Sequence, residues 1–143
     1  MLNKKSEANL EIAKFCLDKK DENFFAVGVS RAYIAIFQAT KGLLVKRGVD
    51  YKKFELNDPS VNNQRDYVLH GTIRRALKYF LQTNGFNNQE DLRFINDINP
   101  TFSKLYFWRL RGDYEDATIY KKNLEDVIEI TERFISELKK YDW

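Results

Sequence analysis

Residues 24–47, FFAVGVSRAYIAIFQATKGLLVKR, carry the strongest indication of the fold. Its apolar side chains recur at a spacing of three and four residues, which is the period of an α-helix, and they are numerous enough to be buried on more than one side. Lys46 and Arg47 suit the negative end of a helix dipole, and Gly48 can end the helix in the left-handed conformation. A long, doubly buried helix favours a helical bundle.

The same periodicity predicts four more helices. They cover about residues 6–19, 66–83, 89–110 and 123–140. Asn99-Pro100 predicts either a kink in the helix at 89–110 or a new helix that Asn99 caps, and Gly112 is the expected exit. Residues 49–65 are rich in turn formers without periodicity, so we predict a long surface loop with a functional or mobile role. The predicted fold is all-α, a single antiparallel bundle of about five helices.

The composition limits the classes of protein. The length of 143 residues suits one domain, expected to span residues 1–143. One cysteine, Cys16, and one histidine, His70, exclude a disulfide framework, a cysteine-rich zinc site and any site that needs two histidines. The sequence shows neither a secretory signal nor a run of about 20 apolar residues, so we expect a cytoplasmic protein without membrane contact. A formal net charge of +3 permits contact with nucleic acid without requiring it.

The common catalytic motifs are missing from the sequence. The six glycines fit neither the dinucleotide-binding fingerprint nor the phosphate-binding loop of nucleotide hydrolases. Ser30 lacks the strand–turn–helix context of a nucleophile elbow. We therefore predict no metal, no cofactor and no catalytic residue of these kinds.

Two short strings are distinctive. Residues 30–39 read SRAYIAIFQA, and residues 109–116 read RLRGDYED, in this order and on two different predicted helices. Together they resemble the HEPN family (higher eukaryotes and prokaryotes nucleotide-binding), in particular its small stand-alone prokaryotic members. Ile34 stands where the family often has a second tyrosine, and Gly112 stands where it often has alanine.

The resemblance implies a helical bundle that forms a homodimer through the predicted helices at 24–47 and 89–110, with a cleft at the dimer interface. Many family members are metal-independent ribonucleases that use an arginine followed closely by a histidine. No histidine follows Arg109 or Arg111 in this sequence. Acid–base cleavage of RNA works best with groups that titrate near neutral pH, as histidine does. The sequence thus lacks the family's ribonuclease motif and leaves open whether the protein is an enzyme.

The candidate residues for binding RNA or a nucleotide are Ser30, Arg31, Arg109, Arg111, Asp113, Tyr114 and His70. Each also has a structural interpretation. Arg31 could bridge the two helices by an ion pair with Asp113, and Arg111 could pair with helix-end carbonyls and a nearby carboxylate. Tyr114 could be a packing residue. His70 could form a local hydrogen bond or cap, or it could serve as an acid–base group borrowed by the dimer cleft.

The resemblance leads to one functional expectation and two alternatives. We expect a non-catalytic or weakly active component of a bacterial nucleotidyltransferase-associated toxin–antitoxin or defence module, which binds RNA, a nucleotide or a nucleotidyltransferase partner. The first alternative is a metal-independent endoribonuclease that uses arginine with aspartate or tyrosine in place of the family histidine. The second is a purely structural protein–protein adaptor.

Overall fold

The computed structural model describes residues 2–54, 65–115 and 118–141, with the backbone alone for Leu2 and residues 65–70. Within these ranges the chain forms helices and no strand. The α-helices are α1 (Leu2–Leu17), α2 (Glu22–Lys46), α4 (Arg65–Thr83), α5 (Gln89–Tyr114) and α6 (Lys121–Leu138), and the short 3-10 helices are η1 (Tyr51–Phe54) and η2 (Lys139–Tyr141). The predicted all-α helical bundle is confirmed.

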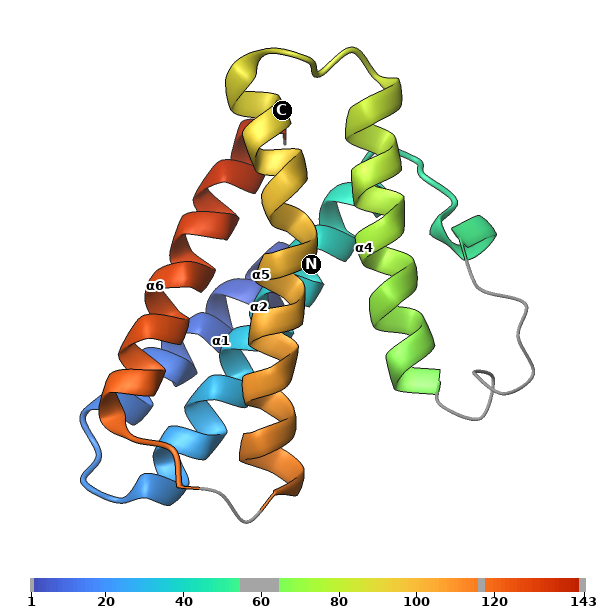
Figure 1. Cartoon of the computed structure of the whole chain (residues 1–143). Helices are drawn as coiled ribbons and strands as arrows, with labels where there is room; N and C mark the ends of the chain where they lie inside the picture. The colour runs from blue at the N-terminus through green and yellow to red at the C-terminus, as the bar shows by residue number, and fades with distance from the viewer. Residues whose placement is uncertain (1, 55–64, 116–117, 142–143) are drawn as a thin grey trace.

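Helix α2 lies at the centre of the bundle and packs against α1, α5, α6 and α4. In Figure 1, α5 and α6 run side by side, α1 and α2 lie behind them, and α4 stands apart on the right. Buried residues follow α2 along its length from Phe25 to Leu44. The burial on more than one side that its apolar content predicts is therefore confirmed.

Local residue types explain several helix ends, and the predicted end of the central helix at Gly48 is confirmed. The carboxylate of Asp21 accepts a hydrogen bond from the backbone N–H of Asn23 and caps α2 at its start. Gly48 follows α2 with a φ of 70°, the left-handed conformation that glycine adopts at low cost. Asn88 and Asp91 form a reciprocal capping box at the start of α5.

The structure changes three sequence predictions. Of the two alternatives for Asn99-Pro100, the new helix is wrong, since α5 continues through Pro100 from Gln89 to Tyr114. Proline deprives the carbonyl of Asn96 of its helical N–H donor, but Asn96 is exposed and water can bind there instead. Gly112 lies inside α5 rather than at its exit. The predicted loop at 49–65 contains the helix η1, and its residues 55–64 lie outside the described ranges.

Gly112 marks the closest approach of α5 to α2. A Cβ atom at this position would lie 2.8 Å from the carbonyl oxygen of Ala26 and 2.9 Å from Cγ2 of Val29. Only glycine fits such a contact with the backbone of a neighbouring helix without a shift. The glycine thus lets the last turns of α5 lie directly on α2, where the candidate residues sit.

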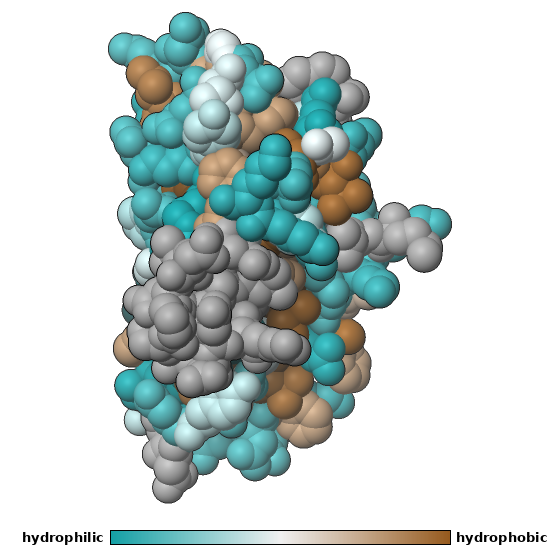
Figure 2. Space-filling view, turned by 90° about the vertical axis from the view of Figure 1, so that its right-hand side faces the viewer, coloured by the Kyte–Doolittle hydropathy of each residue, from teal (hydrophilic) through white to brown (hydrophobic). Residues whose placement is uncertain are grey.

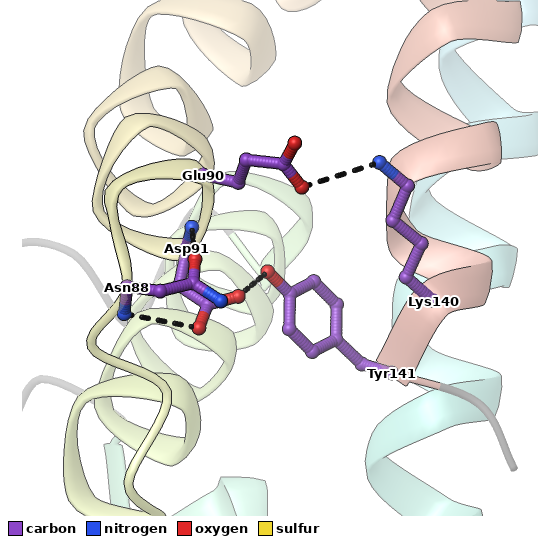
Figure 3. Close-up of polar contacts among 5 residues, drawn as sticks. All are labelled: Asn88, Glu90, Asp91, Lys140 and Tyr141. Carbon is purple, nitrogen blue, oxygen red and sulfur yellow. Dashed lines mark hydrogen bonds and ion pairs between the residues drawn. The ribbon is translucent and has the colours of Figure 1, made fainter.

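Tyr141, near the C-terminus, connects the ends of three helices. Its hydroxyl donates to Oδ1 of Asp91 at 2.6 Å, and Oδ2 of the same carboxylate accepts from the backbone N–H of Asn88 (Figure 3). Arg47, at the end of α2, donates to the carbonyl oxygen of Tyr141 at 2.6 Å. Helix η2 is therefore tied to α2 and to the start of α5.

Some apolar side chains remain at the surface. Phe24, Val27 and Val45 of α2 are exposed. The face on the right-hand side of the molecule shows hydrophobic side chains among hydrophilic ones (Figure 2). In the described part of the chain, no helix has both the length and the apolar character needed to cross a membrane.

Candidate functional site

The structure brings three of the predicted site residues together between α2 and α5. The hydroxyl of Ser30 donates to Oδ2 of Asp113 at 2.9 Å. Nε of Arg109, one helical turn before Asp113, approaches the same oxygen at 3.5 Å. The carboxylate of Asp113 therefore joins a hydroxyl of α2 to a cation of α5, and the close approach at Gly112 makes this possible.

Tyr33 forms the aromatic part of the site. The guanidinium carbon of Arg109 lies 5.4 Å from the centroid of the Tyr33 ring, a cation–π contact, and the ring of Tyr106 lies 5.5 Å away. Burial raises the pKa of the Tyr33 hydroxyl well above its usual range, although Arg109 and Arg74 act in the opposite direction. The phenol therefore stays protonated at neutral pH, as a neutral hydrogen-bonding group.

Arg74 of α4 faces this site from the other side. Its Nη1 lies 3.5 Å from the hydroxyl of Ser103 on α5, and its Nε is buried without a hydrogen-bond partner among the described residues. Its positive charge lowers the pKa of the Tyr33 hydroxyl, against the larger effect of burial. Arg74 from α4 and Arg109 from α5 thus bring cations of two helices to the same part of α5.

Arg31 and Arg111 do not share this site. Arg31 turns to α1, where its Nη1 donates to Oδ1 of Asn9 at 3.1 Å, so the expected ion pair with Asp113 is wrong. The reason is that Ser30, its neighbour in α2, takes the place at Asp113. Nη1 of Arg111 lies 3.6 Å from Glu115 in its own helix, which agrees with the structural interpretation of this residue. No described contact brings Arg31 and Arg111 into one groove.

Tyr114 and His70 are the remaining candidates. Tyr114 is 70% exposed at the end of α5, so it is not a packing residue of the core. His70 belongs to α4, one helical turn before Arg74, and its side chain lies outside the described residues.

Sequence reasoning missed two contributors to the site. In the sequence, Tyr33 is one of many apolar and aromatic residues in the stretch 24–47, and Arg74 is one of several cations that stand in pairs along the chain. The available signals were spacings: Tyr33 lies one turn after Ser30, and Arg74 lies one turn after His70. Neither spacing predicts that α2 and α4 both pack against α5, because that packing depends on the tertiary structure.

Three pockets formed by described residues lie elsewhere. Two of them, of about 380 and 450 Å³, lie between α5 and α6 and share Arg93 and Glu137. The third is small, about 60 Å³, and lies between α1, α2 and α6. None of the three is lined by the predicted site residues. Among the residues described, no group of three or more His, Cys, Asp or Glu side chains is placed to hold a metal ion.

No protein-family model, curated protein sequence or solved structure matches the chain. The class defined by fold and site is an all-α helical bundle with an arginine–tyrosine cluster between α2, α4 and α5. Membership of the HEPN family remains a prediction from residues 30–39 and 109–116.

Proposed function

We propose that this protein is a HEPN-like helical component that binds RNA or a nucleotide without cleaving it, through the cluster of Arg74, Arg109, Tyr33 and Tyr106. The observation that carries the proposal is that two arginines from separate helices meet at α5: Arg109 lies over the Tyr33 ring, and Arg74 of α4 contacts Ser103. Arginine presents several N–H donors in a planar arrangement that fits phosphate oxygens. The ring of Tyr106 is partly exposed beside these cations and provides a surface against which a base can pack, while the buried Tyr33 supports it.

Arg74 is the better phosphate ligand of the two. Arg109 already contacts Asp113, so its charge is partly neutralised. Among the residues that the structure describes, Arg74 makes a long contact with the uncharged Ser103, and its buried Nε has no hydrogen-bond partner. A buried donor without a partner is costly, and an anionic oxygen would satisfy it.

The resemblance extends the proposal to the protein's partners. A homodimer through α2 and α5 would cover the exposed Phe24 and Val27, which lie on α2. A nucleotidyltransferase would be the protein partner within a toxin–antitoxin or defence module. Both expectations rest on the sequence motifs at residues 30–39 and 109–116.

The test is a comparison of two variants that change the net charge equally. Arg74→Gln removes a cation of the cluster, and Arg133→Gln removes an exposed cation of α6. Fluorescence anisotropy with labelled single-stranded RNA should show that Arg74→Gln weakens binding about tenfold, the loss expected for one charge-assisted hydrogen bond, and reduces the salt slope by about 0.7. Arg133→Gln should bind like the wild type. Equal binding by all three proteins would overturn the proposal.

The same RNA, incubated with the wild type in EDTA, separates the alternatives. Cleavage that Arg109→Ala abolishes would support a metal-independent endoribonuclease instead. Neither binding nor cleavage, combined with capture of a nucleotidyltransferase, would support the structural adaptor.

A further inference from the structure

The outer face of the last turns of α5 carries aromatic side chains where a solvent-facing helix surface normally carries polar ones. Lys104, Phe107, Arg111 and Tyr114 recur there at helical spacing, and we refer to them as the outer α5 face. Phe107 is 51% exposed and Tyr114 is 70% exposed. Neither ring is therefore needed to fill the hydrophobic core.

Arg111 is held against this face by aromatic contacts. Its guanidinium carbon lies 5.3 Å from the centroid of the Phe107 ring and 5.9 Å from the Trp108 ring. Its Nε is buried without a hydrogen-bond partner among the described residues. The ion pair with Glu115 is long, at 3.6 Å, and Glu115 is exposed, so water screens it. The guanidinium is thus kept in place by stacking and has donors left for a ligand.

We propose that the outer α5 face binds single-stranded RNA, with bases stacked on Phe107 and Tyr114 and a phosphate held by Arg111. This inference rests on the proposed function and adds a second surface to it, apart from the Arg74–Arg109 cluster. Phe107 and Tyr114 lie about 10 Å apart along the helix axis, given a rise of about 1.5 Å per residue. At a stacked spacing of about 3.4 Å this distance covers about three nucleotides.

Charge and side-chain type favour a single strand over a protein partner. Lys104 lies on the same face, and α6 begins with Lys121 and Lys122 at the same end of the bundle (Figure 1). Phosphates complement these cations. The apolar groups offered by the outer α5 face are rings, which stack on bases of any identity. In a duplex the bases are already stacked on each other and are not available.

The experiment measures anisotropy of fluorescein-labelled oligouridylate and oligoadenylate of about 12 nucleotides, within the usual site sizes for single strands. Phe107→Ala should weaken binding of both by about 5- to 150-fold, the loss of one stacked base. Phe107→Leu should lose binding in the same way, because leucine keeps apolar area without a π face. Phe107→Trp should retain it. An RNA duplex of the same length should bind the wild type more weakly than the single strands.

Phe15→Ala is the matched control. Phe15 is 59% exposed on α1, and Lys19, one turn further on, lies over its ring at 4.4 Å. This variant therefore removes an exposed phenylalanine and a cation–π contact of the same kind from another helix. It should bind the oligonucleotides like the wild type, and circular dichroism should show that both variants are folded.

The outcomes separate this inference from the proposed function. If Arg74→Gln weakens binding and Phe107→Ala does not, the inference fails and the proposed function stands. If Phe107→Ala weakens binding and Arg74→Gln does not, the outer α5 face is the binding site and the cluster is not. A loss of self-association in Phe107→Ala with unchanged RNA binding would overturn the inference, because the face would then be a contact between copies of the chain.

Discussion

The two apolar clusters of this protein differ in size and in what they join. The larger one draws on α1, α2, α5, α6 and, through Leu77 and Leu81, the C-terminal half of α4. The smaller one consists of Leu44, Ile73 and Ala76 and joins α2 to α4, with side chains of η1 packed beside it. Stability follows the amount of apolar surface buried, so α4 is held less firmly at Ile73 than the other helices are held to each other.

This difference affects the candidate site, because the residues of the site come from helices on both sides of the boundary between the two clusters. Arg74 follows Ile73 in α4, whereas Ser30, Tyr33, Arg109 and Asp113 belong to the firmly packed α2 and α5. Arg75 fastens η1 to α4 by donating to the carbonyl oxygen of Phe54 at 2.9 and 3.2 Å. The position of Arg74 therefore depends on a small cluster and one side-chain clamp.

The largest effects are expected when one buried apolar side chain is shortened to alanine in each cluster. Leu105→Ala, in the large cluster, should lower the free energy of unfolding by about 2–5 kcal/mol, as buried leucines usually do. Ile73→Ala should instead loosen α4. Native-state hydrogen exchange should then show faster exchange of α4 amides and unchanged protection in α1 and α6. Equal acceleration in all helices would show that α4 opens only with the whole bundle, and the comparison of the two clusters would be wrong.

The second prediction tests the close approach of α5 to α2 at Gly112. In Gly112→Ala the new Cβ meets the backbone oxygen of Ala26, which cannot move aside alone, so the variant should lose about 1–3 kcal/mol in chemical denaturation. The matched variant is Gly28→Ala, also in a helix. Its nearest neighbours are the two Cδ atoms of Leu124, at the far end of a flexible side chain, followed by Cβ of Cys16 at 3.2 Å. The preference of a helix for alanine, about 1 kcal/mol, is the same in both variants. Gly28→Ala should therefore cost less; the reverse order would contradict the close approach of α5 and α2.

The smallest effect concerns the C-terminal fastening of Tyr141. Tyr141→Phe removes the hydrogen bond to Asp91 and should cost about 1 kcal/mol at neutral pH, since that carboxylate is partly solvated. Burial, followed by the hydrogen bond to Asp91, raises the pKa of the Tyr141 hydroxyl, and burial also raises that of Tyr33.

These raised pKa values give stability a definite pH dependence. The folded protein holds both phenol protons more tightly than the unfolded chain does. Their contribution is complete below about pH 10, the ordinary tyrosine value, and is lost as the pH rises through the raised pKa. Denaturation curves at rising alkaline pH should show this loss, and Tyr141→Phe should show less of it. An identical pH dependence in the variant would assign the effect to other groups.

Much of the fold could be predicted from the sequence because it depends on local patterns. The cap at Asp21, the stop at Gly48 and the capping box at Asn88 are encoded by residue type and neighbours. At Pro100 a local rule also allows a new helix, and α5 continues instead. For the candidate site, the sequence named Ser30, Arg109 and Asp113 as candidates without predicting their contacts, and the one contact it suggested, the ion pair of Arg31 with Asp113, is not formed.

The sequence by itself determined the helices, their ends and the apolar helix α2 at the centre, because helical period and capping act over a few residues. Only the tertiary structure decided which arginine meets which partner. Arg31 faces α1, Arg109 stacks on Tyr33, Arg111 rests on its own helix, and Arg74 reaches the site from α4. The physical reason is that a side chain's direction depends on how helices rotate and approach each other, and at Gly112 that approach is set by the absence of a single Cβ atom.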